Sequence, residues 1–98
     1  MTGEPVTAEK AESWGLIWRA VDDGELMGEA GKLVERLAVG PTRGYAAIKK
    51  AMRGSWLAGL SEQLDLERDL QRELGYSKDF REGVAAFTEK RKPEFTGR

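Results

Sequence analysis

The sequence contains neither cysteine nor histidine. Without cysteine, the chain can form no disulfide, present no thiolate nucleophile and hold no cysteine-ligated zinc. Without histidine, it lacks the side chain that most often transfers protons near neutral pH and most often binds zinc. Any chemistry would therefore fall to Asp, Glu, Lys, Tyr, Ser or Thr, and we expect no metal site.

The chain also lacks a long apolar run and a marked excess of either charge. No apolar stretch approaches the roughly 18 residues needed to cross a bilayer, and the start lacks the apolar core of a signal peptide. The net charge of -1 gives no reason to expect nucleic acid or an anionic membrane as a partner. We therefore expect a cytoplasmic protein that binds neither.

The composition is that of one small globular domain covering residues 1–98. Hydrophobic residues make up 40% of the chain and charged residues 34%, which is typical of a folded soluble domain rather than a disordered tail. A chain of this length buries only about 60 to 65% of the surface that its unfolded form exposes. We therefore expect a modest core.

Apolar periodicity and capping residues predict five helices and an all-α bundle or array. Thr7, Asp22 or Asp23, Thr42 and Ser77 are the expected helix starts, and Gly15 is expected to end the first helix in the left-handed conformation. The predicted helices cover residues 8–14, 22–38, 42–53, 60–74 and 77–91.

Residues 16–21 interrupt this pattern and predict a short extended segment, because they are rich in residues that favour strands. No second strand is predicted to pair with it. Its backbone N–H and C=O groups would then need water or another chain as partners.

The segment from Asp79 to Phe95 resembles the closing segment of enoyl-CoA hydratase/isomerase (crotonase) family proteins. It matches the pattern D-x-x-E-G-x-x-A-F-x-x-K-R-x-P-x-F, and residues 7–17 and 41–49 resemble two earlier family segments, A-x-x-A-x-x-x-G-L-V and P-x-x-A-x-x-x-x-K. Gly44 departs from the small-to-medium apolar residue common at its position. Residues 15–23 and 64–73 look most like the ring-1,2-epoxyphenylacetyl-CoA isomerase branch of phenylacetate degradation.

The resemblance implies that this chain is the C-terminal helical domain of a longer enzyme. In that family an N-terminal spiral of ββα turns carries the oxyanion hole and the acidic residues, and this spiral is absent here, so we expect no catalytic residue and no activity in the chain alone. Met1 then looks like a start codon added to an excised domain. The parent would be an enoyl-CoA hydratase or ring-epoxide isomerase, a homotrimer or hexamer acting on a coenzyme A thioester, with no covalently bound cofactor.

Two residues of the last helix are candidates for contact with acyl-CoA. The resemblance implies that Lys90 reaches the adenosine-phosphate end of coenzyme A, often in a neighbouring subunit, and that Phe87 covers the acyl or pantetheine portion. Both also have a purely structural interpretation. In that interpretation, the cluster Lys90-Arg91-Lys92 offsets the negative end of the helix dipole and has no ligand. Phe87 then packs in the core with Phe80 and Val84.

The carboxylates and tryptophans are less specific. Glu82, Glu89 and the other paired acidic residues are expected on solvated faces and at helix starts, although Gly83 inside a helix suggests close backbone packing. Trp18 and Trp56 could anchor the core or face a missing partner surface.

Two other functions remain as alternatives. One is a stand-alone helical interaction module. The gene of a two-part enzyme would encode about 160 further residues upstream, whereas that of a stand-alone module would not. A miniature carboxylate enzyme would need an Asp or Glu with a raised pKa in a closed cleft.

Overall fold

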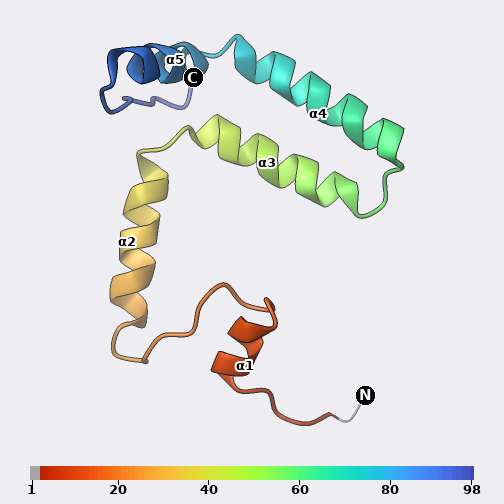
Figure 1. The fold of residues 1–98 in the computed structure, drawn as a ribbon, viewed down its shortest axis with the longest axis vertical. Helices are drawn as coiled ribbons and strands as arrows, with labels where there is room; N and C mark the ends of the chain where they lie inside the picture. The colour runs from red at the N-terminus through yellow and green to blue at the C-terminus, as the bar shows by residue number, and fades with distance from the viewer. Residues whose placement is uncertain (1–2) are drawn as a thin grey trace. The chain divides into compact units, whose positions relative to one another are not determined.

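The computed structural model describes residues 3–98 and contains five α-helices within that range (Figure 1). The all-α prediction is confirmed, and no strand is assigned between residues 3 and 98. The expectation about Met1 falls outside the described residues. The helices are α1 (Ala8–Ser13), α2 (Leu26–Ala38), α3 (Thr42–Ser55), α4 (Leu60–Gly75) and α5 (Lys78–Glu89).

The contacts between residues gather into two compact units, and the boundary between them falls inside α2. The first unit runs to Leu33 and the second covers Val34–Arg98. Each unit is described separately below, and the expectation of a single domain stays a prediction.

In the first unit, α1 is capped as the sequence predicts. The Thr7 hydroxyl accepts a hydrogen bond from the Lys10 N–H at 3.3 Å, and Gly15 takes the left-handed conformation with φ of 72°. Only Gly adopts this conformation without steric cost, which explains a glycine at this turn.

The segment 16–21 forms no strand, and residues 16–18 bend instead. The expectation that its backbone lacks partners within the chain is wrong for three N–H groups. Those of Leu16 and Ile17 donate to the Ala11 carbonyl at 2.9 and 3.4 Å, and that of Ala20 donates to the Glu12 carboxylate at 2.9 Å. The loop is therefore tied back onto α1.

α2 begins at Leu26, later than the predicted start at Asp22 or Asp23. The Asp22 carbonyl instead accepts from the Glu25 N–H at 2.8 Å and closes a turn ahead of the helix. Asp favours turns as much as helix starts, which explains the difference.

In the second unit, α3 and α4 run side by side in opposite directions (Figure 1). α3 continues to Ser55 rather than ending near Arg53, and Gly54 lies inside it. A β-carbon at Gly54 would stand 3.0 Å from the Leu66 side chain of α4. The glycine therefore allows the two helices to approach closely.

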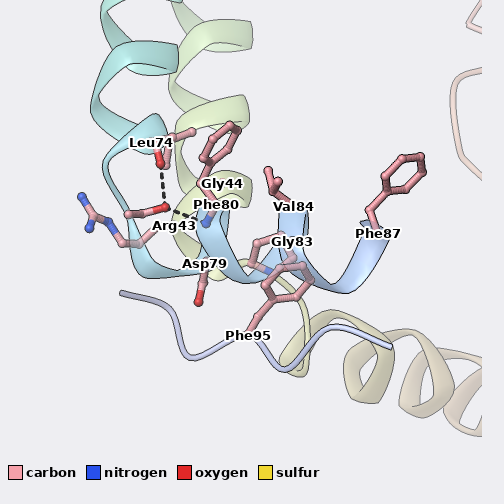
Figure 2. A pocket seen from close by; sticks show the side chains of 11 residues that line it. Arg43, Gly44, Leu74, Asp79, Phe80, Gly83, Val84, Phe87 and Phe95 are labelled. Atoms are coloured by element: carbon pink, nitrogen blue, oxygen red, sulfur yellow. Dashed lines mark hydrogen bonds between the residues drawn. The ribbon is translucent and has the colours of Figure 1, made fainter. Parts of the chain in front are cut away.

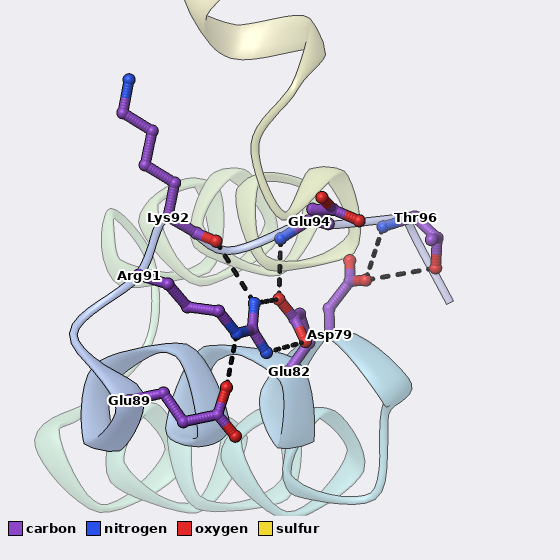
Figure 3. A network of polar contacts seen from close by, with 7 residues as sticks. All are labelled: Asp79, Glu82, Glu89, Arg91, Lys92, Glu94 and Thr96. Carbon is purple, nitrogen blue, oxygen red and sulfur yellow. Dashed lines mark hydrogen bonds and ion pairs between the residues drawn. The ribbon is translucent and has the colours of Figure 1, made fainter.

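α5 ends at Glu89, two residues before the predicted end. Lys90 takes the left-handed conformation with φ of 56°, and the Arg91 N–H then donates to the Ala86 carbonyl at 3.0 Å. This is the closing geometry of a Schellman turn, built on lysine instead of the usual glycine. The chain beyond it folds back along α5 (Figure 3).

Little of the apolar surface is covered within the chain. Ala11 and Ala86 are the buried hydrophobic residues among those described, and none of the large side chains there is fully buried. The accessible surface is 8653 Å², whereas a folded monomer of 10.9 kDa exposes roughly 5,600 Å² and two separate units of these sizes roughly 6,700 Å². The chain therefore presents apolar faces that its own residues do not cover.

Candidate functional site

An apolar pocket of about 410 Å³ lies along α5, from its first turn to Phe87 (Figure 2). Its polar lining is confined to Arg43, Ser77 and Asp79. Pockets of this size and character are typical of sites that receive an apolar ligand. The remaining lining residues are Pro41, Gly44, Leu74, Phe80, Gly83, Val84, Phe87 and Phe95.

Ser77 fixes the start of α5 against the end of α4. Its hydroxyl donates to the Leu74 carbonyl at 2.6 Å and accepts from the Phe80 N–H at 3.0 Å, as Figure 2 shows. The predicted N-cap is therefore confirmed. Because Ser77 is only 7% exposed, this joint is shielded from water, and it determines where Phe80 enters the pocket wall.

Phe87 lines the pocket but is 87% exposed. The alternative interpretation, packing in the core of the chain, is therefore wrong for the residues described. Phe80 and Val84 are about half exposed as well. The predicted stripe is real, but it forms an open pocket wall rather than the inside of a closed core.

Phe95 forms the opposite part of the wall, where it faces the helix backbone (Figure 2). A β-carbon at Gly83 would stand 3.6 Å from its ring. This is an ordinary van der Waals distance, so the Phe95 ring packs beside Gly83 but does not require a glycine there.

The three cations of the cluster Lys90-Arg91-Lys92 differ in whether a carboxylate pairs with them. The Arg91 guanidinium donates to both oxygens of Glu82 and, through Nε, to Glu89 at 2.6 Å, which raises the pKa of Arg91. Within residues 3–98, Lys90 and Lys92 have no carboxylate within 4 Å. Arg91 is thus paired with carboxylates instead of offsetting the helix dipole, while two lysine charges stay open to a ligand.

Two carboxylates of α5 hold the returning chain, here called the C-terminal strap (residues 91–98; Figure 3). Asp79 accepts from the Thr96 N–H at 2.7 Å, the Thr96 hydroxyl at 3.3 Å and the Gly97 N–H at 2.9 Å, and the Thr96 amide is the main reason that its pKa is lowered. Glu82 accepts from Arg91 and from the Glu94 N–H at 2.8 Å, which lowers its pKa to about 2.

The expectation of a solvated face is wrong for Glu82, whereas Glu89 is exposed as expected. Asp79 is only 5% exposed and Glu82 is half-buried. Both are held ionised, so neither can act as a general acid near neutral pH. Within the described chain no cluster of acidic residues is placed to hold a metal ion. Among the same residues, no helix has the length and apolar character that crossing a membrane requires.

We expect the strap to detach as the pH falls from about 4.5 toward 2. A carboxyl group whose pKa is lowered on folding adds stability above its ordinary pKa of 4.5, and this contribution is lost as the pH falls through the folded value of about 2. Backbone amide shifts of Glu94 and Arg91, followed by NMR against pH, would measure this. A midpoint near 4.5 for the Glu94 amide would contradict the ion pair as the holding contact.

Comparison with known proteins places all 98 residues in one family. Residues 1–98 match the family model described as enoyl-CoA hydratase/isomerase. The chain is 48% identical to the 1,2-epoxyphenylacetyl-CoA isomerase of Escherichia coli (strain K12) and 42% identical to the trans-2-decenoyl-[acyl-carrier-protein] isomerase of Streptococcus mutans (strain UA159). Each alignment covers 100% of this chain and 37% of the relative.

Solved structures give the same result. An enoyl-CoA hydratase from Geobacillus kaustophilus HTA426 superposes with a TM-score of 0.92 at 32% identity, over 99% of this chain and 37% of that one. An enoyl-CoA hydratase from Polaromonas sp. JS666 gives 0.91 at 29% identity, over 96% and 37%. The chain therefore spans just over a third of the length of the proteins it matches.

Proposed function

Because the chain belongs to the enoyl-CoA hydratase/isomerase family, we propose that it is the helical part of an acyl-CoA-processing enzyme, where it covers the acyl-CoA pocket and contacts neighbouring subunits. The observation that carries this proposal is the position of Phe87 and Lys90. An exposed aromatic ring lines an apolar pocket, and an unpaired cation follows it by three residues, at the end of the same helix.

These two residues suit the two ends of a coenzyme A thioester. The apolar acyl and pantetheine portion matches the pocket beside Phe87, and the nucleotide phosphates match the ammonium of Lys90. We infer no chemistry on this chain itself, since its pocket-lining carboxylate Asp79 is ionised and bonded to the strap. The catalytic groups and the oxyanion-stabilising N–H donors would come from the part of the enzyme that precedes this one.

The parent activity is proposed to be that of an enoyl-CoA hydratase or a ring-epoxide isomerase of phenylacetate degradation, in a cytoplasmic homotrimer or hexamer. Relatives with both kinds of name are similarly identical to the chain, the Escherichia coli isomerase at 48% and a probable enoyl-CoA hydratase of Rhodobacter capsulatus at 50%, so both activities are kept. The substrate would be a coenzyme A thioester, with no covalently bound cofactor. Large exposed apolar side chains, Trp56 and Leu57 among them, support contacts with the rest of the enzyme or with other subunits.

The first test is a titration of the isotope-labelled chain with an acyl-CoA, followed through the backbone amides of Phe87, Lys90 and Arg91. Shifts confined to this end of α5 support the proposal. Shifts that an acyl-CoA and a non-nucleotide thioester produce equally at Lys90 would contradict a phosphate contact there.

Lys90 allows a sharper prediction, because glycine and alanine change it in different ways. Lys90→Gly should remove the left-handed strain of about 1–2 kcal/mol and raise stability, whereas Lys90→Ala should keep the strain. Both remove the ammonium, so both should weaken acyl-CoA binding by about tenfold, the weight of one charge-assisted contact. Isothermal titration and thermal unfolding would measure the two effects. Full affinity in either variant would rule out the phosphate role.

A further inference from the structure

The C-terminal strap is joined to α5 at two points one helical turn apart. Glu82 binds Arg91 and the Glu94 N–H, and Asp79 binds the Thr96 and Gly97 N–H groups (Figure 3). Residues three apart lie on the same face of a helix, so both carboxylates face the strap. Charge-assisted hydrogen bonds therefore hold the strap against α5.

Lys90 is the residue on which the chain turns from α5 into the strap. A left-handed conformation costs a residue other than glycine about 1–2 kcal/mol, and it persists only where the surroundings enforce it. Here the Lys90 N–H donates to the Phe87 carbonyl at 3.3 Å and the Arg91 N–H to the Ala86 carbonyl. These bonds require that Arg91 stay folded back over the helix end.

Glu82 supplies the contact that holds Arg91 in that place. Its two oxygens receive Nη1 and Nη2 of the guanidinium, the latter at 2.9 Å, and one of them also receives the Glu94 N–H at 2.8 Å. A two-pronged arginine–carboxylate pair fixes orientation as well as distance. Glu82 thus fixes both ends of the segment 91–94, which directly follows Lys90.

We propose that Glu82 is a positioning residue: by holding Arg91 and Glu94, it fixes the left-handed turn from which the Lys90 ammonium reaches the nucleotide phosphates of an acyl-CoA. This inference rests on the proposed function and assigns separate tasks within one cationic cluster. Lys90 binds the phosphate, while Arg91, whose guanidinium donates to Glu82, Glu89 and the Lys92 carbonyl, orients the turn and does not touch the ligand.

The test compares the affinities of an acyl-CoA and of the same acyl group on pantetheine, which lacks the nucleotide. The variants Lys90→Ala, Glu82→Gln and the two combined are made in the full-length gene product. Lys90→Ala should lower the preference for the CoA form by about tenfold. Glu82→Gln should lower this preference by a similar factor. In the double variant the preference should be no lower than in Lys90→Ala, because both changes remove the same interaction, the one between Lys90 and the phosphates.

Glu89→Gln is the matched control. Glu89 also lies on α5 and binds the same guanidinium at 2.6 Å, but no strap N–H donates to it. It should keep the preference for the CoA form. If Glu82→Gln disturbs folding, as circular dichroism would reveal, Arg91→Lys replaces it: this change keeps the charge, loses the two-pronged bond and should lower the same preference.

The possible outcomes separate the two proposals. If Lys90→Ala lowers the preference for CoA and Glu82→Gln does not, the positioning role is wrong and the phosphate contact stands. Equal loss for both thioesters in Glu82→Gln, or a loss that adds to that of Lys90→Ala, would make Glu82 a structural residue only. An unchanged preference in Lys90→Ala would overturn the phosphate contact and the positioning role with it.

Discussion

Replacing Ser77 with alanine should lower the free energy of unfolding by about 2 kcal/mol. The hydroxyl makes two hydrogen bonds at the joint between α4 and α5, one donated to the Leu74 carbonyl and one accepted from the Phe80 N–H. Because the site is shielded from water, alanine would leave the Phe80 N–H without a partner, whereas the Leu74 carbonyl would keep only the bond from the backbone N–H of residue 77 at 2.9 Å. Urea unfolding followed by circular dichroism measures the loss.

Ser77→Thr and Ser55→Ala are the controls for this change. Threonine keeps the hydroxyl and should restore most of the stability. Ser55 also donates to a carbonyl three residues earlier, that of Met52 at 2.8 Å, but it lies exposed at the end of α3. Its replacement should cost less than about 0.5 kcal/mol. Similar losses in the free energy of unfolding for Ser77→Ala and Ser55→Ala would show that the α4–α5 joint contributes no more to stability than an exposed helix end.

Replacing Trp56 with alanine should have the opposite profile, with a small effect on the chain and a large one on assembly. Trp56 is 86% exposed, so its removal should change the stability of the chain by no more than about 0.5 kcal/mol. If it contacts another subunit or the preceding part of the enzyme, as proposed, association should weaken by about 2 kcal/mol or more, roughly 30-fold. Dissociation of the full-length assembly on dilution, followed by analytical ultracentrifugation, measures this.

Arg53→Ala provides the comparison, since it removes a large exposed side chain near the same end of α3 without removing an aromatic ring. It should leave both stability and assembly nearly unchanged. A loss of stability in the monomeric chain on Trp56→Ala would contradict the interface role and favour the alternative in which Trp56 anchors the core.

The elements of the fold could be predicted from the sequence wherever the signal is local. Thr7, Gly15 and Ser77 mark helix ends through contacts within four residues, and all three act as predicted. The sequence predicts an end of α5 that is two residues too late, because nothing local distinguishes Lys90 from an ordinary helical lysine. Its left-handed turn depends on the pairing of Arg91 with Glu82, nine residues earlier.

Exposure and long-range contacts were the parts that the sequence could not predict. Periodicity shows that Phe80, Val84 and Phe87 share a face, but it does not show what covers that face. The burial of Asp79 depends on amides 17 and 18 residues away in the strap, and a carboxylate in the first turn of a helix carries no mark of such partners.

The attachment of the strap at its far end bears on how the protein can be handled. The backbone oxygen of Arg98 accepts from the Asp79 N–H at 3.0 Å, and Gly97, with φ of 74°, passes so close to Thr42 that a β-carbon would stand 2.7 Å from its hydroxyl. A purification tag or fluorophore joined after Arg98 would thus emerge beside the capped start of α5 and compete with its anchoring. Labels are better placed at the other terminus.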